Sequence, residues 1–180
     1  MQKTIESYFL GTVEATSTLF EKKLFGHLLV VIYSTIDTMG LLDAPTSQES
    51  ATRETFKQWV KKYLLSYPGL EFNEVDLYAA RCAVLHTHTS KSALSSSGQA
   101  RELQYYSGDR ESATALRFVS LTKSIQNGIH LPVRLDDLLL ALFDALKKFA
   151  IELDTKCNSD SACSKRLGGI LQLYNMQDVL

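Results

Sequence analysis

Residues 24–42, with the sequence LFGHLLVVIYSTIDTMGLL, make up the most apolar stretch of the chain. Apolar side chains recur at helical spacing along one face of this stretch, at Leu24, Leu28, Ile32 and Ile36. Other apolar side chains cover most of the remaining faces, and a helix that is apolar nearly all round is buried by its neighbours. We therefore predict a central core helix from about Leu24 to Met39, which Gly40 ends.

The same stretch is too short and too polar for a membrane span, because His27, Asp37 and several hydroxyl groups interrupt it. The N-terminal residues do not resemble a secretory signal peptide, since Lys3, Glu6 and Glu14 break up their apolar residues. We therefore expect a cytoplasmic protein that does not contact membranes.

The composition fits one domain over residues 1–180. The hydrophobic residues make up 45% of the 180 and can form a core without disulfide bonds or structural metal ions. The formal net charge of -1 excludes a global basic field, so any contact with RNA must come from a local patch. Cys82, Cys157 and Cys163 cannot all pair within one chain. We expect reduced thiols, with a Cys157–Cys163 disulfide as the alternative.

Helical patterns flank the core helix on both sides. An amphipathic helix precedes it between Ile5 and Phe20. Further helices follow: one capped by Ser50, one capped by Asn73 that fades between His86 and Thr89, one from Leu135 to Leu153 and one from about Ser161 to Tyr174. The Ser/Thr-rich residues 87–98 predict an exposed loop.

Two short segments rich in β-forming residues follow that loop, at Glu102–Tyr106 and Ala115–Leu121. Residues 107–109 separate them with a turn signal, which predicts a β-hairpin. Residues 129–133 add a short extended segment, and Pro132 favours an edge position for it. The fold is therefore predicted to be mainly α, a bundle of five or six helices with a small β-hairpin after the fourth helix.

The stretch from Leu77 to Lys91, LYAARCAVLHTHTSK, carries the clearest chemistry. Arg81 lies inside an apolar-faced helix, and His86 follows where that helix should end, about 140° further around its axis. A guanidinium binds phosphate with a planar fork, and a histidine can take a proton near neutral pH. Because the 2′-hydroxyl of RNA is an internal nucleophile, a base and a cation on the phosphate can drive cleavage without metal.

This stretch resembles the signature of the HEPN superfamily, an Arg followed after four to six residues by a His. The surrounding helical pattern is similar too, with the motif at the end of one helix. The resemblance implies a metal-independent endoribonuclease or RNA-binding protein, including toxins of toxin–antitoxin and abortive-infection systems. The matching residues are Arg81 and His86, with His88 as a second reading of the spacing. Cys82 departs from the family pattern, which commonly has a polar residue such as Asn there.

In that family the Arg and His act at a composite site formed by dimerisation, so the resemblance implies a homodimer. Arg81 would bind the scissile phosphate, and His86 would be the general base. Tyr78, His88, Lys91 and Arg101 are candidates for contacting the RNA. An antitoxin or another protein partner is also implied. No metal and no cofactor is expected, because the His and Cys residues lack ligand spacing and no phosphate-binding Gly-rich loop is present.

Structural roles for the same residues stay open. Arg81 can instead pair with Asp76, Glu74 or a carboxylate from another helix. His86, when protonated, can interact favourably with the negative end of the helix dipole. These roles fit the alternative function, a non-catalytic helical interaction domain that binds a protein or nucleotide partner. A helical bundle that binds a small molecule is a third reading, which would need an apolar pocket.

Overall fold

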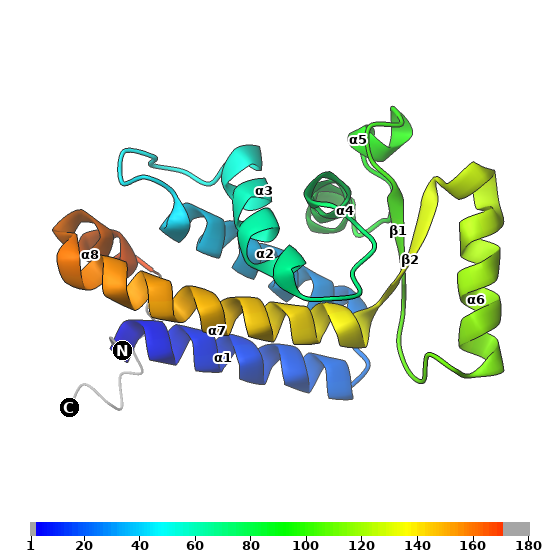
Figure 1. Ribbon diagram of the computed structural model, residues 1–180, viewed down its shortest axis with the longest axis horizontal. Helices are drawn as coiled ribbons and strands as arrows, with labels where there is room; N and C mark the ends of the chain where they lie inside the picture. The colour runs from blue at the N-terminus through cyan, green and yellow to red at the C-terminus, as the bar shows by residue number, and fades with distance from the viewer. Residues whose placement is uncertain (1–2, 171–180) are drawn as a thin grey trace.

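The computed structural model describes residues 3–170, and its chain is mainly helical, as predicted (Figure 1). The helices are α1 Lys3–Glu21, α2 Phe25–Asp43, α3 Arg53–Lys62, η1 Leu64–Ser66, α4 Glu74–Thr87, α5 Ala93–Ser96, α6 Ala113–Ser124, η2 Ile125–Gly128, α7 Leu135–Ser159 and α8 Ser161–Gly168. The strands are β1 Glu102–Tyr106 and β2 His130–Arg134. The described residues thus form eight α-helices rather than five or six, because α5 lies in the predicted loop and α6 covers a predicted strand.

Helix α2 occupies the centre of the bundle and contacts α1, α3, α4, α7 and α8. Figure 1 shows α1 and α7 side by side along one edge of the molecule, with α3 and α4 on the other side of α2. The side chains of Leu28, Ile32 and Ile36 are fully buried, which confirms the predicted core helix. Within residues 3–170, α2 is also the one helix long and apolar enough to cross a membrane, a composition that a core helix shares.

Gly40 does not end α2, which continues to Asp43. A Cβ atom on Gly40 would lie 2.6 Å from the backbone oxygen of Thr55. Gly40 therefore allows close approach of α2 and α3 instead of breaking the helix. The cap of α3 also differs from the prediction, since Thr52 rather than Ser50 accepts a hydrogen bond from the backbone N–H of Thr55.

The predicted β-hairpin is wrong, because β1 and β2 pair in parallel, with Leu103 opposite Leu131. Parallel strands need a crossover connection, and α6 supplies it. The segment predicted as the second strand, Ala115–Leu121, lies within α6, where Ser112 caps the helix. Buried Ala115 and Thr122 lie seven residues apart on one face of this helix. The extended segment predicted at residues 129–133 is confirmed as β2, and both strands are edges of a two-stranded sheet.

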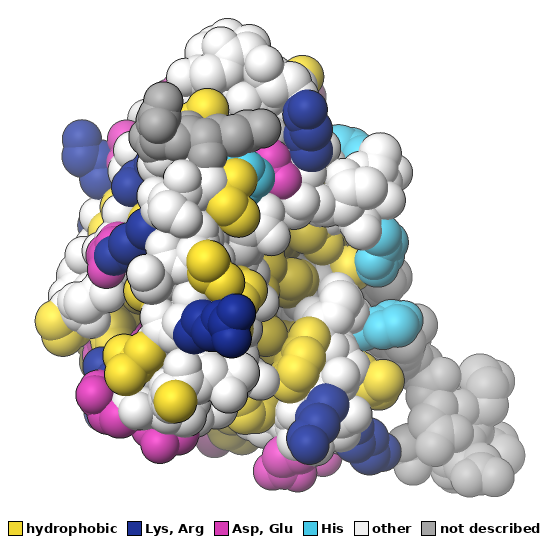
Figure 2. Space-filling model, turned by 90° about the vertical axis from the view of Figure 1, so that its right-hand side faces the viewer, with side chains coloured by type: hydrophobic (Ala, Val, Ile, Leu, Met, Phe, Trp, Pro, Cys, Tyr) yellow, Lys and Arg dark blue, Asp and Glu magenta, His cyan; other side chains and the backbone are white. Residues whose placement is uncertain are grey.

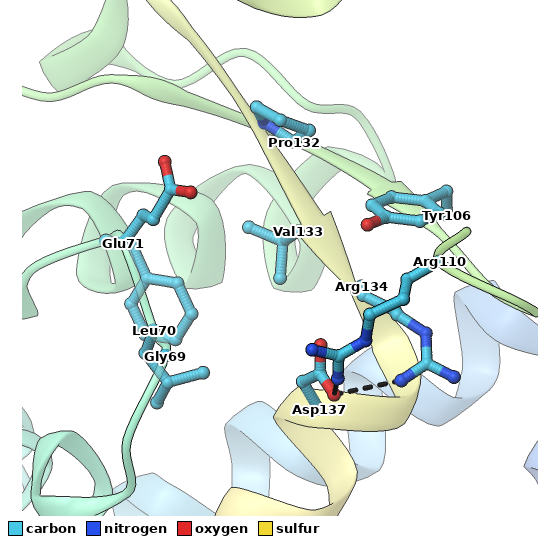
Figure 3. A pocket seen from close by; sticks show the side chains of 10 residues that line it. Gly69, Leu70, Glu71, Tyr106, Arg110, Pro132, Val133, Arg134 and Asp137 are labelled. Carbon is cyan, nitrogen blue, oxygen red and sulfur yellow. Dashed lines mark hydrogen bonds and ion pairs between the residues drawn. The ribbon is translucent and has the colours of Figure 1, made fainter. Parts of the chain in front are cut away.

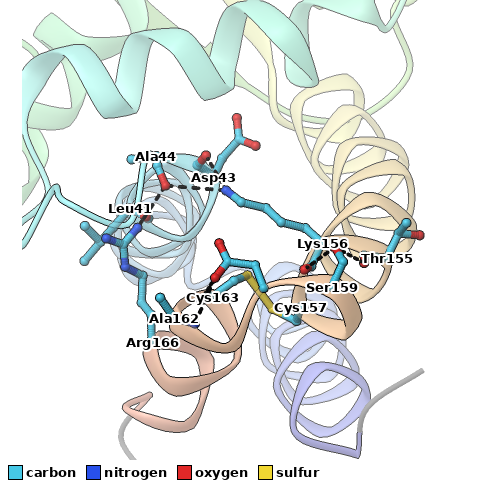
Figure 4. The surroundings of a disulfide bond; sticks show 11 residues. Leu41, Asp43, Ala44, Thr155, Lys156, Cys157, Ser159, Ala162, Cys163 and Arg166 are labelled. Atoms are coloured by element: carbon cyan, nitrogen blue, oxygen red, sulfur yellow. Dashed lines mark hydrogen bonds between the residues drawn. A yellow bond between two sulfur atoms is a disulfide. The ribbon is translucent and has the colours of Figure 1, made fainter.

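Cys157 and Cys163 form a disulfide at the junction of α7 and α8, so the expectation of reduced thiols is wrong for this pair (Figure 4). Asp160 ends α7 and caps α8, and this tight corner brings the two Cα atoms to 5.0 Å. Cys82 is a free thiol. Disulfides are found mainly in oxidising compartments. The Cys157–Cys163 disulfide therefore argues against a cytoplasmic location, which stays a prediction.

The same corner places two cations against the C-terminal end of α2 (Figure 4). Lys156 Nζ donates to the backbone oxygen of Asp43, and Arg166 donates to those of Leu41 and Ala44. Cations there donate hydrogen bonds to carbonyl groups that the helix leaves unpaired, and they interact favourably with the negative end of its dipole. The last helix ends at Gly168, and its predicted continuation to Tyr174 extends outside the described residues.

A Gly40→Ala substitution should lower the free energy of unfolding by about 1–3 kcal/mol, because its methyl group collides with the backbone of α3. Gly11→Ala is the matched control, since an added Cβ at exposed Gly11 of α1 meets nothing within 4 Å. That control should gain about 0.5–1 kcal/mol from helix propensity. Denaturant unfolding of both variants measures the difference, and equal effects would contradict the packing role of Gly40.

Tyr33 of α2 shares a hydrogen bond between hydroxyl groups with Tyr105 of β1, and burial raises the pKa of Tyr33 well above its usual value. An unfolded tyrosine ionises near pH 10, so the native state loses stability as the pH rises above about 10 toward the raised pKa. Tyr33→Phe should therefore lose less stability than the wild type between pH 9 and 11. Thermal unfolding across that range tests this, and identical pH slopes would contradict it.

Candidate functional site

Helix α4 carries Arg81 and sets its position relative to α2. Asn73 and Asp76 form a capping box at the start of α4, and the helix packs against α2 and α3. Arg81 Nε and Nη2 both donate to Oδ2 of Asp37, at 2.9 and 2.6 Å. The two side chains are only 21% and 18% exposed, so this ion pair is largely shielded from water. Arg81 thus pairs with a carboxylate from another helix, one of the partners left open by the sequence.

His86 lies beside the remaining side of the same guanidinium. Arg81 Nη1 is 3.4 Å from His86 Nε2, and the His86 ring is exposed. The helical spacing places the two residues on different faces, but the long arginine side chain bridges the gap. The structure therefore brings together Asp37, Arg81 and His86 at the C-terminal end of α4.

The Arg81 guanidinium stays charged. Partial burial acts to lower its pKa, but the hydrogen bonds and charge of Asp37 outweigh this effect and raise the pKa of Arg81. A guanidinium has five N–H donors, of which two bind Asp37 and one faces His86. Cys82 also hydrogen-bonds to the guanidinium, so at most one donor is left for an anion, while Asp37 holds the group in place. When Nη1 donates to Nε2, it occupies the one lone pair of that nitrogen, so Nε2 can accept a proton from a substrate only once this contact opens.

Tyr78 lies one turn before Cys82 on α4, next to this cluster. Burial raises the pKa of Tyr78, and its hydrogen bond with Cys82 adds to the increase. Its ring packs edge-on against Phe56, and the Arg53 guanidinium lies 5.6 Å from the ring centre. These contacts tie Tyr78 to α3.

The other sequence candidates lie apart from Arg81. Arg101 forms an ion pair with buried Asp76 at the first turn of α4, about 15 Å along the helix from His86. His88 takes a left-handed conformation at the end of α4, with its ring 6.3 Å from that of His27. Lys91 is exposed in the following loop. The structure does not bring Arg101 to the cluster.

Three hollows in the described part of the molecule bear on ligand binding. One of about 190 Å³ lies beside His88, between α2, α4 and β1. A second of about 170 Å³ lies at the carboxyl edge of the sheet, where Arg110 and Arg134 both bind Asp137 (Figure 3). The largest of the three, of about 500 Å³, has mostly apolar walls, and Asp37 is one of the residues that line it.

The sequence did not single out Asp37 as a site residue. One signal was available, because Asp37 is the one carboxylate in the apolar residues 24–42 and a buried charge needs a partner. Its partner Arg81 lies 44 residues away, so no local pattern joins them. Within residues 3–170, no three His, Cys, Asp or Glu side chains converge as a metal site would require.

Comparison with protein-family models, with curated proteins and with solved structures finds no match to this chain.

Replacing Arg81 with Ala should lower the free energy of unfolding by about 1.5–3 kcal/mol, because it leaves the shielded Asp37 carboxylate without its charged partner. Asp37→Asn should cost a similar amount for the same reason. His86→Ala, at an exposed position, should change stability by less than about 0.5 kcal/mol. Denaturant unfolding compares the three variants. A neutral Arg81→Ala would show that the ion pair does not stabilise the fold.

Proposed function

We propose that this chain is a HEPN-like, metal-independent endoribonuclease that acts as a homodimer. The observation that carries the proposal is the contact of Arg81 Nη1 with His86 Nε2, 3.4 Å apart at the exposed end of α4. A fixed cation and an accessible base therefore lie next to each other, as metal-free RNA cleavage requires. Asp37 supports this role because it fixes the guanidinium without using all of its donors.

In the proposed reaction, His86 removes the proton of the RNA 2′-hydroxyl, and the resulting oxygen attacks the adjacent phosphorus atom. The bond from phosphorus to the 5′-oxygen breaks, and the 5′-oxygen takes a proton from a protonated His86 of the second copy. The products are a 2′,3′-cyclic phosphate and a 5′-hydroxyl end. Arg81 neutralises the charge that develops on the phosphate oxygens. A toxin with an antitoxin partner in the cytoplasm is the biological setting we propose.

The alternative is a non-catalytic interaction domain, and two observations favour it. First, the Asp37–Arg81 ion pair neutralises the arginine within the chain. Second, large apolar side chains are exposed on and after α6, at Leu116, Leu121, Ile125 and Ile129. Figure 2 shows hydrophobic side chains across this side of the molecule, with histidines along one margin. Exposed apolar surface of this kind is typical of protein–protein contacts.

The two functions differ in a cleavage assay on single-stranded RNA in excess chelator. The nuclease proposal predicts cleavage by the wild type that ends in a cyclic phosphate, and a loss of at least about 100-fold in His86→Ala. His130→Ala is the matched control, since His130 lies on β2 outside the cluster, and it should keep full activity. Full activity of His86→Ala, or no cleavage by the wild type, would reject the nuclease and leave the interaction domain.

A further inference from the structure

A small hollow lies between α2, α4 and β1. Its volume is about 190 Å³, and a cavity of about 150 Å³ already holds one benzene ring. Apolar side chains from all three elements line it, namely Leu29 of α2, Val84 of α4 and Leu103 of β1. The hollow therefore has the size and much of the lining for a single flat ring, which is the pocket that a bundle binding a small molecule requires.

The edge of β1 that faces away from β2 carries unpaired backbone groups. Glu102 donates its N–H to the backbone oxygen of Ile129, just before β2. Backbone groups alternate in direction along a strand, so the N–H and C=O groups of Leu103 and Tyr105 point away from β2. Within residues 3–170, these four groups have no hydrogen-bond partner.

A hydrogen bond of Arg101 shows where this edge points. Arg101 has the same place in the alternation as Leu103 and Tyr105, and its N–H donates to Oδ1 of Asp76 on α4, at 2.7 Å. Figure 1 shows α4 beside β1, and the two elements are in contact. The hollow lies between the same two elements, and both Leu103 and Tyr105 line it. Their unpaired backbone groups therefore face the hollow.

Burial makes these unpaired groups selective. Leu103 is only 1% exposed, so bulk water does not replace a missing hydrogen-bond partner there. A ligand with only carbon atoms along its edge would leave a buried carbonyl and a buried N–H unpaired, which costs free energy. A ligand that supplies one donor and one acceptor satisfies both.

We propose that this hollow binds a flat heterocycle with a lactam edge, in which a ring N–H lies next to a carbonyl. The C=O of Leu103 accepts from the ring N–H, and the N–H of Tyr105 donates to the ring carbonyl. These two groups are neighbours on one edge of the strand, where a paired strand would place its own N–H and C=O. Neither Arg81 nor His86 lines the hollow, so this site does not depend on the proposed nuclease.

NMR titration of the full chain with 2-pyridone tests this site. The matched control ligand is 1-methyl-2-pyridone, in which a methyl group replaces the ring N–H. We expect 2-pyridone to bind in about the millimolar range, as a fragment of this size does, and about five- to tenfold more tightly than the control. The control is weaker because it leaves the C=O of Leu103 unpaired. The amide proton signal of Tyr105 should shift downfield when 2-pyridone binds.

A variant that fills the hollow is the second test. Gly26 of α2 lines the hollow, and a Cβ atom there meets one atom within 4 Å, Nδ1 of His88 at 3.9 Å. Gly26→Leu should therefore abolish binding of 2-pyridone. Gly11→Leu on α1, where a Cβ meets nothing within 4 Å, should retain it. Circular dichroism checks that both variants fold.

Four results would overturn the proposal: no binding of 2-pyridone to the wild type, equal affinity for the two pyridones, amide shifts that spare residues 103–105, or undiminished binding by Gly26→Leu. The comparison of the two pyridones uses the wild type alone, so it decides the matter even where Gly26→Leu fails to fold.

Discussion

Burial of α2 is the constraint on which the rest of this structure depends. Five helices cover it, and its fully buried side chains include Leu28, Ile32 and Ile36. The apolar surface removed from water drives this arrangement, and Gly40 permits the close contact with α3 that completes it. Because α2 cannot shift without exposing its apolar side chains, the backbone at Asp37 is held at a fixed place.

Asp37 is the polar group that gains most from this rigidity. It lies on a buried helix with one edge exposed, where it can hold Arg81 of α4 in a single orientation. A preorganised guanidinium costs no reorganisation when an anion arrives, which is how fixed charges contribute most to catalysis. The same ion pair weakens the attraction of Arg81 for an anion. The balance between these two effects decides between a nuclease and an interaction domain.

The sequence predicted the elements that depend on local patterns. The core helix, the Asn73 cap and the long helix beginning at Leu135 follow from hydrophobic spacing and capping chemistry, and the structure confirms them. The sheet was predicted wrongly, because parallel pairing of β1 and β2 joins segments separated by a whole helix. The segment between them forms the amphipathic helix α6. Its β-branched and aromatic residues favour strands, which led to the wrong prediction of a strand there.

The candidate site was predictable only in part. Arg81 and His86 are close in sequence and could be paired from the motif, whereas the roles of Asp37 and Arg101 depend on tertiary contacts that no sequence spacing reveals.

The most direct measurement is a titration with uncleavable 2′-O-methyl RNA, followed by NMR of the arginine Nε–H and histidine ring signals. We expect the Arg81 and His86 signals to shift together while those of His130 stay unchanged. No shift at either Arg81 or His86 at saturating RNA would contradict the account.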